Sequence, residues 1–236
     1  MCTVSFVCSN DKVIITSNRD EKIIRPGAVP PKNYTVNGKN IIYPKDSKAG
    51  GTWYVVDEKG TVLVLLNGAD KKHLVKLPYR KSRGLIVIEM IGSASPKDFW
   101  NGINLENIEP FTLVLFQDKQ LFQLRWDGTE KSTVDLEIDK NYIWSSSTLY
   151  SKEIREQRSS WFYTFLDSNP EITESKMLHF HRYTEAENDQ DGLVINRNGE
   201  MKTLSITQSV IEKNKVIIHH FDLITEKEYS KTFISI

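Results

Sequence analysis

The chain opens with two short apolar, β-branched runs separated by a polar break, and this pattern predicts a β-hairpin. The first run lies in residues 1–7 and the second in residues 13–16, with Ser9-Asn10-Asp11 between them. The second run leads directly into Asn18-Arg19-Asp20-Glu21. An antiparallel return brings this tetrad beside the chain start, so the hairpin places a guanidinium and a carboxylate near the thiol of Cys2.

Cys2 is the candidate nucleophile. If Met1 is removed, Cys2 becomes the N-terminus, and its α-amine, with a pKa of roughly 8, can act as general base for its own thiol. Arg19 would favour the thiolate because its guanidinium keeps its charge. Asp20 would accept hydrogen bonds from the α-ammonium group. This interpretation requires both side chains to fold close to residue 2 and to point into the same layer of the fold; the alternative is a buried edge-strand cysteine beside a salt-linked turn.

Further motifs extend the pattern along the chain. Met1-Cys2-Thr3, the tetrad Asn18-Arg19-Asp20-Glu21, Gly50-Gly51-Thr52-Trp53 and Leu65-Leu66-Asn67-Gly68-Ala69 occur in this order. Together they resemble the NRDE family, also called the transport and Golgi organisation protein 2 family, over the whole chain. The resemblance implies an α+β fold, a four-layer αββα sandwich of two antiparallel sheets. That architecture is similar to N-terminal-nucleophile (Ntn) hydrolases such as penicillin V acylases and bile-salt hydrolases.

By resemblance, Asn67 would donate its amide to an oxyanion hole; an Asn-Gly turn at a strand end is the alternative. Trp53 would line a substrate pocket, although an aromatic residue there also suits a core. Asn18 and Ser146 complete the predicted substrate-binding set. Ser146 stands where family members commonly carry asparagine, and its hydroxyl can also donate a hydrogen bond. A second departure is the lack of an arginine just before Gly192.

Composition limits the class of protein. The 236 residues contain no Pro/Gly/Ser-rich linker, which predicts a single domain over residues 1–236. Basic and acidic residues number 31 each, and this balance argues against a nucleic-acid-binding protein. No apolar stretch approaches the ~20 residues that cross a bilayer, and no leader-like start is evident. We therefore expect a cytoplasmic protein without a transmembrane segment.

Periodicity predicts the elements between the motifs. Residues 25–31 read as a loop because prolines disfavour a central strand. The continuously apolar residues 62–66 indicate a strand covered on both faces. Hairpins are expected over residues 52–66 and 111–126. Helices are expected over residues 82–92 and 151–167, a short helix beginning at Ser95-Pro96, and a further helix that follows Asn169-Pro170 and continues to residue 178. A meander of strands is expected at residues 193–195, 201–207, 216–221 and 227–233.

The histidines do not show metal-site spacing, so no structural metal is predicted. His73 reads as a surface-loop residue. The leading functional interpretation is hydrolysis of an amide bond in a small molecule without a cofactor. The alternatives are a haem- or lipid-handling protein, as proposed for relatives in the resembled family, and a binding module whose ancestral site has decayed. Substrate identity and oligomeric state do not follow from the sequence.

Overall fold

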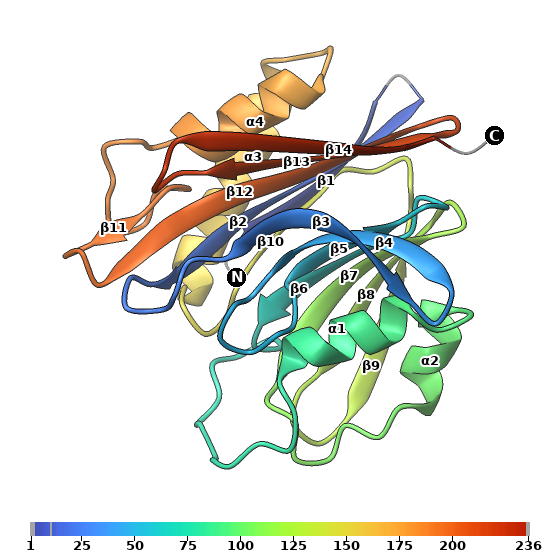
Figure 1. Cartoon of the computed structure of the whole chain (residues 1–236). Coiled ribbons are helices and arrows are strands. Elements are labelled where there is room, and N and C mark those ends of the chain that lie inside the picture. Colours follow the sequence, from blue (N-terminus) through green and yellow to red (C-terminus); the bar gives the residue numbers. More distant parts are fainter. Residues whose placement is uncertain (1–2, 10, 235–236) are drawn as a thin grey trace.

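Two antiparallel sheets lie face to face, and a pair of helices covers the outer side of each (Figure 1). The computed structural model describes residues 3–9 and 11–234. The predicted αββα sandwich of the α+β class is confirmed.

The first sheet contains the N-terminal hairpin at its centre and the C-terminal meander at one side. Its strand order is β10 (Tyr142–Ser145), β1 (Thr3–Ser9), β2 (Lys12–Lys22), β12 (Met201–Glu212), β13 (Lys215–Asp222) and β14 (Lys227–Ile234), with β11 (Asn196–Arg197) paired to β12. In the hairpin, Thr3 lies opposite Asn18. The far side of β2 pairs with β12, so the tetrad 18–21 lies in the interior of the sheet.

The second sheet follows chain order throughout. It consists of β3 (Val29–Val36), β4 (Lys39–Lys45), β5 (Tyr54–Asp57), β6 (Val62–Asn67), β7 (Phe111–Gln117), β8 (Gln120–Trp126) and β9 (Lys131–Leu136). Every residue of β6 except Asn67 is buried, as expected for a strand covered on both faces.

Four helices form the outer layers. Against the second sheet lie α1 (Arg83–Ile91) and α2 (Pro96–Gly102), and against the first lie α3 (Lys152–Asp167) and α4 (Glu174–Tyr183). Two of these helices start where predicted and have side-chain caps: Ser95 accepts a hydrogen bond from the amide of Asp98, and Ser151 from that of Ile154. These caps fix where α2 and α3 begin.

The main core fills the space between the sheets. Its largest polar member is Tyr54, which is fully buried and donates its hydroxyl to the carbonyl oxygen of Ile15 at 2.8 Å. The same hydroxyl lies 2.6 Å from the Ser209 hydroxyl. One residue of the second sheet is thereby hydrogen-bonded to two strands of the first.

Two predicted elements need correction, and one strand was not predicted. Residues 25–31 are not wholly loop, because β3 begins at Val29 and includes Pro30 and Pro31. It is an edge strand whose pairing with β4 shifts register in this stretch, so the missing amides interrupt no central ladder. Residues 193–195 form a bend and irregular backbone instead of a strand, and the short strand β11 begins at Asn196. Strand β9 was not predicted, since its exposed edge position requires no apolar alternation.

Candidate functional site

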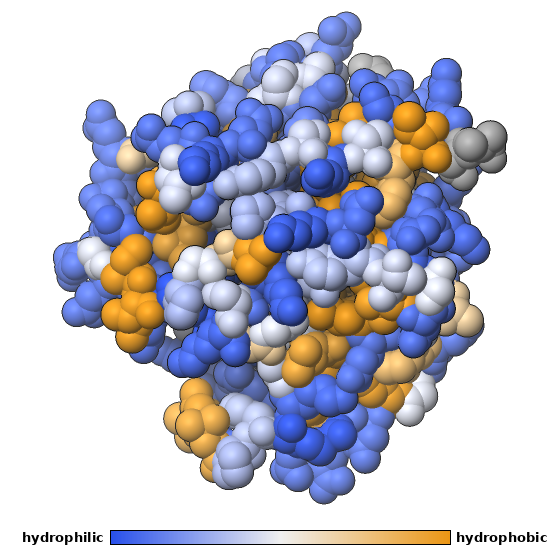
Figure 2. All heavy atoms as spheres, in the orientation of Figure 1, coloured by the Kyte–Doolittle hydropathy of each residue, from blue (hydrophilic) through white to orange (hydrophobic). Residues whose placement is uncertain are grey.

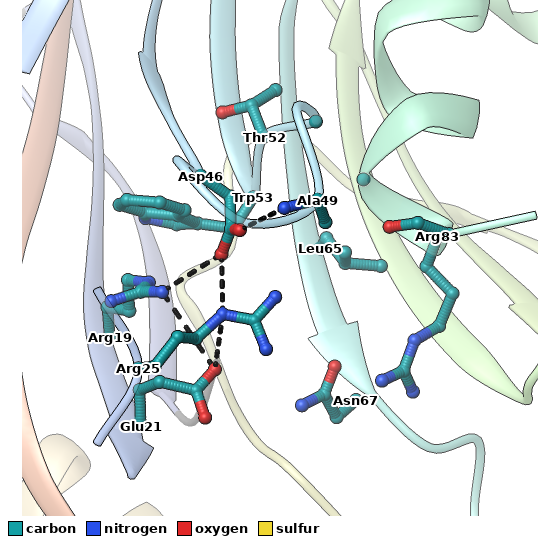
Figure 3. Close-up of a pocket in the computed structure, with 13 residues that line it drawn as sticks. Arg19, Glu21, Arg25, Asp46, Ala49, Thr52, Trp53, Leu65, Asn67 and Arg83 are labelled. Carbon is teal, nitrogen blue, oxygen red and sulfur yellow. Dashed lines mark hydrogen bonds and ion pairs between the residues drawn. The ribbon is translucent and has the colours of Figure 1, made fainter. Parts of the chain in front are cut away.

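A small polar cavity lies between the sheets at the ends of β2 and β6 (Figure 3). Its volume is about 110 Å³. The first sheet contributes Arg19 and Glu21, the second contributes Asn67, and the connecting segments contribute Arg25 and Asp46. The cavity is therefore built from parts of the chain that the two facing sheets bring together.

Strand alternation decides which residues of the tetrad reach this cavity. Successive residues of a strand point to opposite faces, so Arg19 and Glu21 share the face between the sheets. Their charged groups lie 3.8 Å apart, from Arg19 Nη2 to Glu21 Oε2. Asn18 and Asp20 point to the other face, toward the helices, as their hydrogen bonds below demonstrate.

Asp46 is the centre of a buried charge cluster. Its Oδ2 atom accepts hydrogen bonds from Arg19 Nη2 at 3.1 Å and from Arg25 Nε at 2.8 Å. Burial raises the pKa of Asp46, but the hydrogen bonds from Arg25 and the Ala49 amide, with the two arginine charges, outweigh it and hold that pKa below its ordinary value. The carboxylate stays ionised and fixes both guanidinium groups at the cavity wall.

Arg19 is buried between this carboxylate and an aromatic ring. Its guanidinium carbon lies 4.4 Å from the centre of the Trp53 ring, a cation–π contact. Burial lowers the pKa of Arg19, and the charges of Glu21 and Asp46 act in the opposite direction. The Trp53 indole N–H is buried and has no hydrogen-bond partner among residues 3–9 and 11–234. Trp53 lines the cavity, and its contact with substrate stays a prediction.

Asn67 ends β6 and extends its amide into the cavity from the second sheet (Figure 3). The next residue, Gly68, has a φ of +81°, so the chain turns sharply as the strand ends. Behind the cavity, the Ser146 hydroxyl donates to the Asn67 carbonyl oxygen at 2.8 Å. Ser146 is buried and does not line the cavity; it supports Asn67 from the other strand layer.

Arg83, the first residue of α1, reaches into the cavity opposite Arg25 (Figure 3). It forms an ion pair with Glu109 at 2.8 Å and donates to the Pro110 carbonyl oxygen at 3.0 Å. Burial lowers its pKa. The helix start packs closely on the chain at Gly51, where an added Cβ would lie 2.4 Å from the Gly84 carbonyl carbon. The Gly50-Gly51 motif thus permits α1 to begin at the cavity.

Asn18 is anchored in the helix layer and does not line the cavity. Its side-chain amide donates to the carbonyl oxygens of Leu193 at 2.6 Å and His181 at 3.0 Å. Its oxygen lies 2.5 Å from His181 Nδ1, and His181 Nε2 lies 2.7 Å from the Ser5 hydroxyl. The structure therefore gives Asn18 structural contacts in place of the predicted contact with substrate.

Asp20 also faces the helices, opposite to Arg19. It accepts hydrogen bonds from the Tyr150 hydroxyl at 2.7 Å and the Thr203 hydroxyl at 2.5 Å. The expectation that Arg19 and Asp20 point into the same layer is wrong, because adjacent residues of a strand face opposite sides of the sheet. Cys2, the predicted nucleophile, lies outside the described residues.

Four residues of the site were not predicted from the sequence. Glu21 belongs to the tetrad and shares its face with Arg19, so strand alternation was the available signal. Arg25, Asp46 and Arg83 come from three separate segments. Nothing in their local sequence predicts that they meet, and only the packing of the sheets brings them together.

The cavity suits a small polar group. Three arginines and two carboxylates line it, and the third arginine, Arg83, is paired with Glu109 outside the lining, so the charges of the cluster balance. Within the described chain, no group of three or more His, Cys, Asp or Glu side chains is arranged to hold a metal ion. None of the described helices combines the length and hydropathy that crossing a membrane requires.

Solved structures define the class of this fold. The Caenorhabditis elegans ortholog of N-acylethanolamine-hydrolyzing acid amidase matches with a TM-score of 0.64 at 9% identity, over 88% of this chain and 92% of the amidase. Two variants of the conjugated bile acid hydrolase from Clostridium perfringens match with TM-scores of 0.53 and 0.52 at 10% identity, over 100% of this chain and 97% of the hydrolase. At such identities the likeness shows the fold, which is that of the Ntn hydrolases.

The sequence then places the chain within a family. It belongs to the transport and Golgi organisation 2 family, whose model matches residues 1–234. The resemblance carried by the tetrad and the two later motifs is confirmed. No curated protein matches this sequence.

Proposed function

We propose that this protein is an N-terminal-cysteine hydrolase that cleaves an amide bond in a small molecule, with Cys2 as nucleophile. One observation carries the proposal. Arg19 from the first sheet and Asn67 from the second converge on one polar cavity, at the end of the sheet where Thr3 of β1 pairs with Asn18 of β2. Thr3, the residue that follows Cys2 in the sequence, thus lies at this end of the first sheet.

The proposed reaction uses the groups in fixed roles. The α-amine of Cys2 takes the thiol proton, and the sulfur attacks the carbonyl carbon of the amide. The oxyanion that forms accepts a hydrogen bond from the Asn67 amide. The carbon–nitrogen bond then breaks, and the leaving amine takes the proton from the α-ammonium group. Water hydrolyses the remaining thioester, which releases the acid and restores the thiol.

The opposite facing of Arg19 and Asp20 restricts this mechanism. It requires the thiol of Cys2 to reach the face of the first sheet that Arg19 occupies. Arg19 then acts on the sulfur. Asp20, on the other face, is left to orient the α-amine. The two residues serve different groups in this proposal, although they are neighbours in sequence.

The polar lining of the cavity narrows the proposed substrate. A volume of about 110 Å³ holds only a small part of a molecule. The guanidinium groups in the wall favour a part that carries a carboxylate or a polarised carbonyl, since arginine pairs with such oxygens in two-pronged geometry. We therefore place the scissile amide, with its polar end, in this cavity.

The first experiment is intact-mass spectrometry of the protein isolated from its own cells. The proposal expects Met1 to be absent. Retention of Met1 in native protein would remove the proposed base and contradict the mechanism.

The second experiment measures thiol alkylation by iodoacetamide, with Cys8 as internal control. Burial raises the pKa of the Cys8 thiol, so Cys8 is expected to react slowly. Cys2 is expected to react at least tenfold faster, and Arg19→Gln to remove that difference. Asn67→Ala is expected to leave alkylation unchanged while it lowers amide turnover by about 10²-fold. Equal alkylation of both thiols in wild-type protein would contradict an activated Cys2.

Haem or lipid handling stays the alternative expectation, and haemin titration tests it. The described histidines give it little support. Both ring nitrogens of His181 are engaged by Ser5 and Asn18. His73, predicted as a surface-loop residue, is partly buried and pairs with Glu109 at 3.3 Å. A Soret shift that is lost on replacing one histidine would favour a carrier over a hydrolase.

A further inference from the structure

The loop between β6 and α1, residues 70–82, exposes a cluster of aliphatic side chains. Leu74 is 85% exposed, Val75 64% and Leu77 78%. This loop extends away from the body of the molecule at the lower left of Figure 1, and Figure 2 shows hydrophobic atoms at that corner. Three large aliphatic residues within four positions differ from the scattered single residues that soluble surfaces usually expose.

The same loop is strongly basic. It carries five cationic residues, Lys71, Lys72, Lys76, Arg80 and Lys81, and one carboxylate, Asp70. That carboxylate is paired with an arginine of β8, at 3.6 Å. Across the described residues, no carboxylate lies within 4.0 Å of the ammonium groups of the first three of these lysines. In a chain of zero net charge, the loop is a local concentration of unpaired positive charge.

The loop is attached to the body of the protein at its base, and His73 also pairs with Glu109. The Arg80 amide donates to the Asn107 carbonyl oxygen at 2.8 Å, and its guanidinium donates to the carbonyl oxygens of Asn104 and Glu106. The amide of Lys76 donates to the Tyr79 hydroxyl at 2.9 Å. These bonds fix the ends of the tip and leave its apolar side chains directed into solvent.

We propose that residues 71–81 dock this protein on the surface of an anionic lipid bilayer. The loop combines aliphatic side chains with lysines, which suit the acyl-chain boundary and the anionic headgroup region of such a surface, respectively. Leu74, Val75 and Leu77 would enter the boundary between headgroups and acyl chains, while the lysines stay among the anionic headgroups. Charge complementarity selects this occupant over a neutral apolar partner, because three lysine ammonium groups have no internal counter-ion.

Docking has a consequence for the cavity. The loop begins three residues after Asn67 and ends at Ser82, and both line the cavity together with Arg83. The bilayer would therefore lie close to the cavity entrance. This consequence rests on the proposed function, whereas docking itself does not require Cys2 or hydrolysis.

Vesicle co-sedimentation of the full chain tests the proposal. One set of vesicles contains phosphatidylcholine alone, and the other contains about 30 mol% phosphatidylserine. We expect sedimentation with the second set and much less with the first, with loss of binding near 0.5 M salt. The double variant Leu74→Asp/Leu77→Asp should weaken binding more than tenfold. Replacing Lys71, Lys72 and Lys76 by glutamine should weaken it on the order of a hundredfold.

Matched variants control for general effects of charge and exposure. Ile24 is 85% exposed, the same as Leu74, so Ile24→Asp should bind like wild type. Glutamine replacements of the exposed lysines 59, 119 and 213 remove the same charge elsewhere and should have a small effect. Thermal melting by circular dichroism should give one midpoint for all variants, since these side chains are exposed.

Two results would overturn the proposal. The first is sedimentation that does not depend on phosphatidylserine or that is equal in the loop variants and the Ile24 control. The second is a concentration-dependent dimer, seen by analytical ultracentrifugation, that the Leu74/Leu77 double variant abolishes; the loop would then bind a second copy of the chain. Loss of amide turnover or of Cys2 reactivity has no bearing on either result, so failure of the hydrolase proposal stays distinguishable.

Discussion

At the scale of single residues, the buried Ser5–His181–Asn18 network shows how β1, β2 and α4 are joined. The Asn18 amide nitrogen donates to two carbonyls, so its oxygen is left to accept from His181 Nδ1–H. The Nε2 atom then accepts from the Ser5 hydroxyl. This pattern requires a neutral imidazole. Burial, with the nearby charge of Arg158, lowers the pKa of His181 to about 3.

A dependence of stability on pH follows. The pKa of a histidine in the unfolded chain is about 6.5. Below that pH, His181 binds a proton in the unfolded chain but not in the folded protein. Stability is therefore full above about pH 6.5 and declines as the pH falls toward 3. The contribution to the slope approaches about 1.4 kcal/mol per pH unit. The free energy of unfolding of wild type and His181→Gln can be measured by urea denaturation at several pH values between about 3 and 6.5. Its slope against pH should be smaller in the variant by about 1.4 kcal/mol per pH unit.

The control is His179→Gln, on an exposed position of the same helix. His220 is also buried, which lowers its pKa to about 4, and it is retained in both variants. An unchanged slope in His181→Gln would show that His181 is not held neutral by the fold.

At the scale of elements, the end of β6 depends on a glycine. An added Cβ at Gly68 would lie 2.4 Å from the Ser147 hydroxyl oxygen and 2.8 Å from a Thr148 methyl carbon. Because φ is +81° there, a side chain is also unfavourable for the backbone itself. The turn that directs Asn67 into the cavity thus needs glycine for two independent reasons.

Gly68→Ala is compared with Gly38→Ala, which has the same φ of +81° and nothing within 4 Å of an added Cβ. Gly38→Ala should cost about 1 kcal/mol through backbone strain alone. Gly68→Ala should cost roughly 2 kcal/mol more through overpacking. Urea denaturation measures both. Equal losses in the two variants would mean that the β6 end accommodates the methyl group freely.

At the scale of the whole molecule, Tyr54 links the two sheets through hydrogen bonds inside the core. Tyr54→Phe removes its hydroxyl and leaves a buried carbonyl and the Ser209 hydroxyl without this partner. We expect a loss of about 1–3 kcal/mol in the free energy of unfolding. Tyr183→Phe, on a side chain that is 51% exposed, should change it by less than about 0.5 kcal/mol. A loss no larger than that of the control would show that the hydroxyl contributes nothing to sheet association.

Most elements were predictable because they follow from local patterns, whereas the four-layer architecture was expected from the resemblance to the family. Two apolar runs predicted the hairpin of β1 and β2, and Ser95 and Ser151 predicted the starts of two helices. The exposed strand β9 lacked such a pattern. The site was predictable in part: Arg19, Trp53 and Asn67 do line one cavity. Asp46 and Arg83 also line this cavity because segments distant in the sequence pack together, and no local sequence pattern predicts that packing.

Because successive side chains of the tetrad face opposite sides of β2, substitutions at its different positions should affect the protein in different ways. A missense change at Asn18 breaks bonds that hold α4 to the sheet, so the cell should contain less of the protein. A change at Glu21, on the solvent-reachable wall of the cavity, should leave the amount nearly normal and alter what the cavity accepts. Immunoblots would measure the amount of each variant protein, and ligand assays would measure its binding. Together they would distinguish loss of protein from altered binding at two positions of the same tetrad.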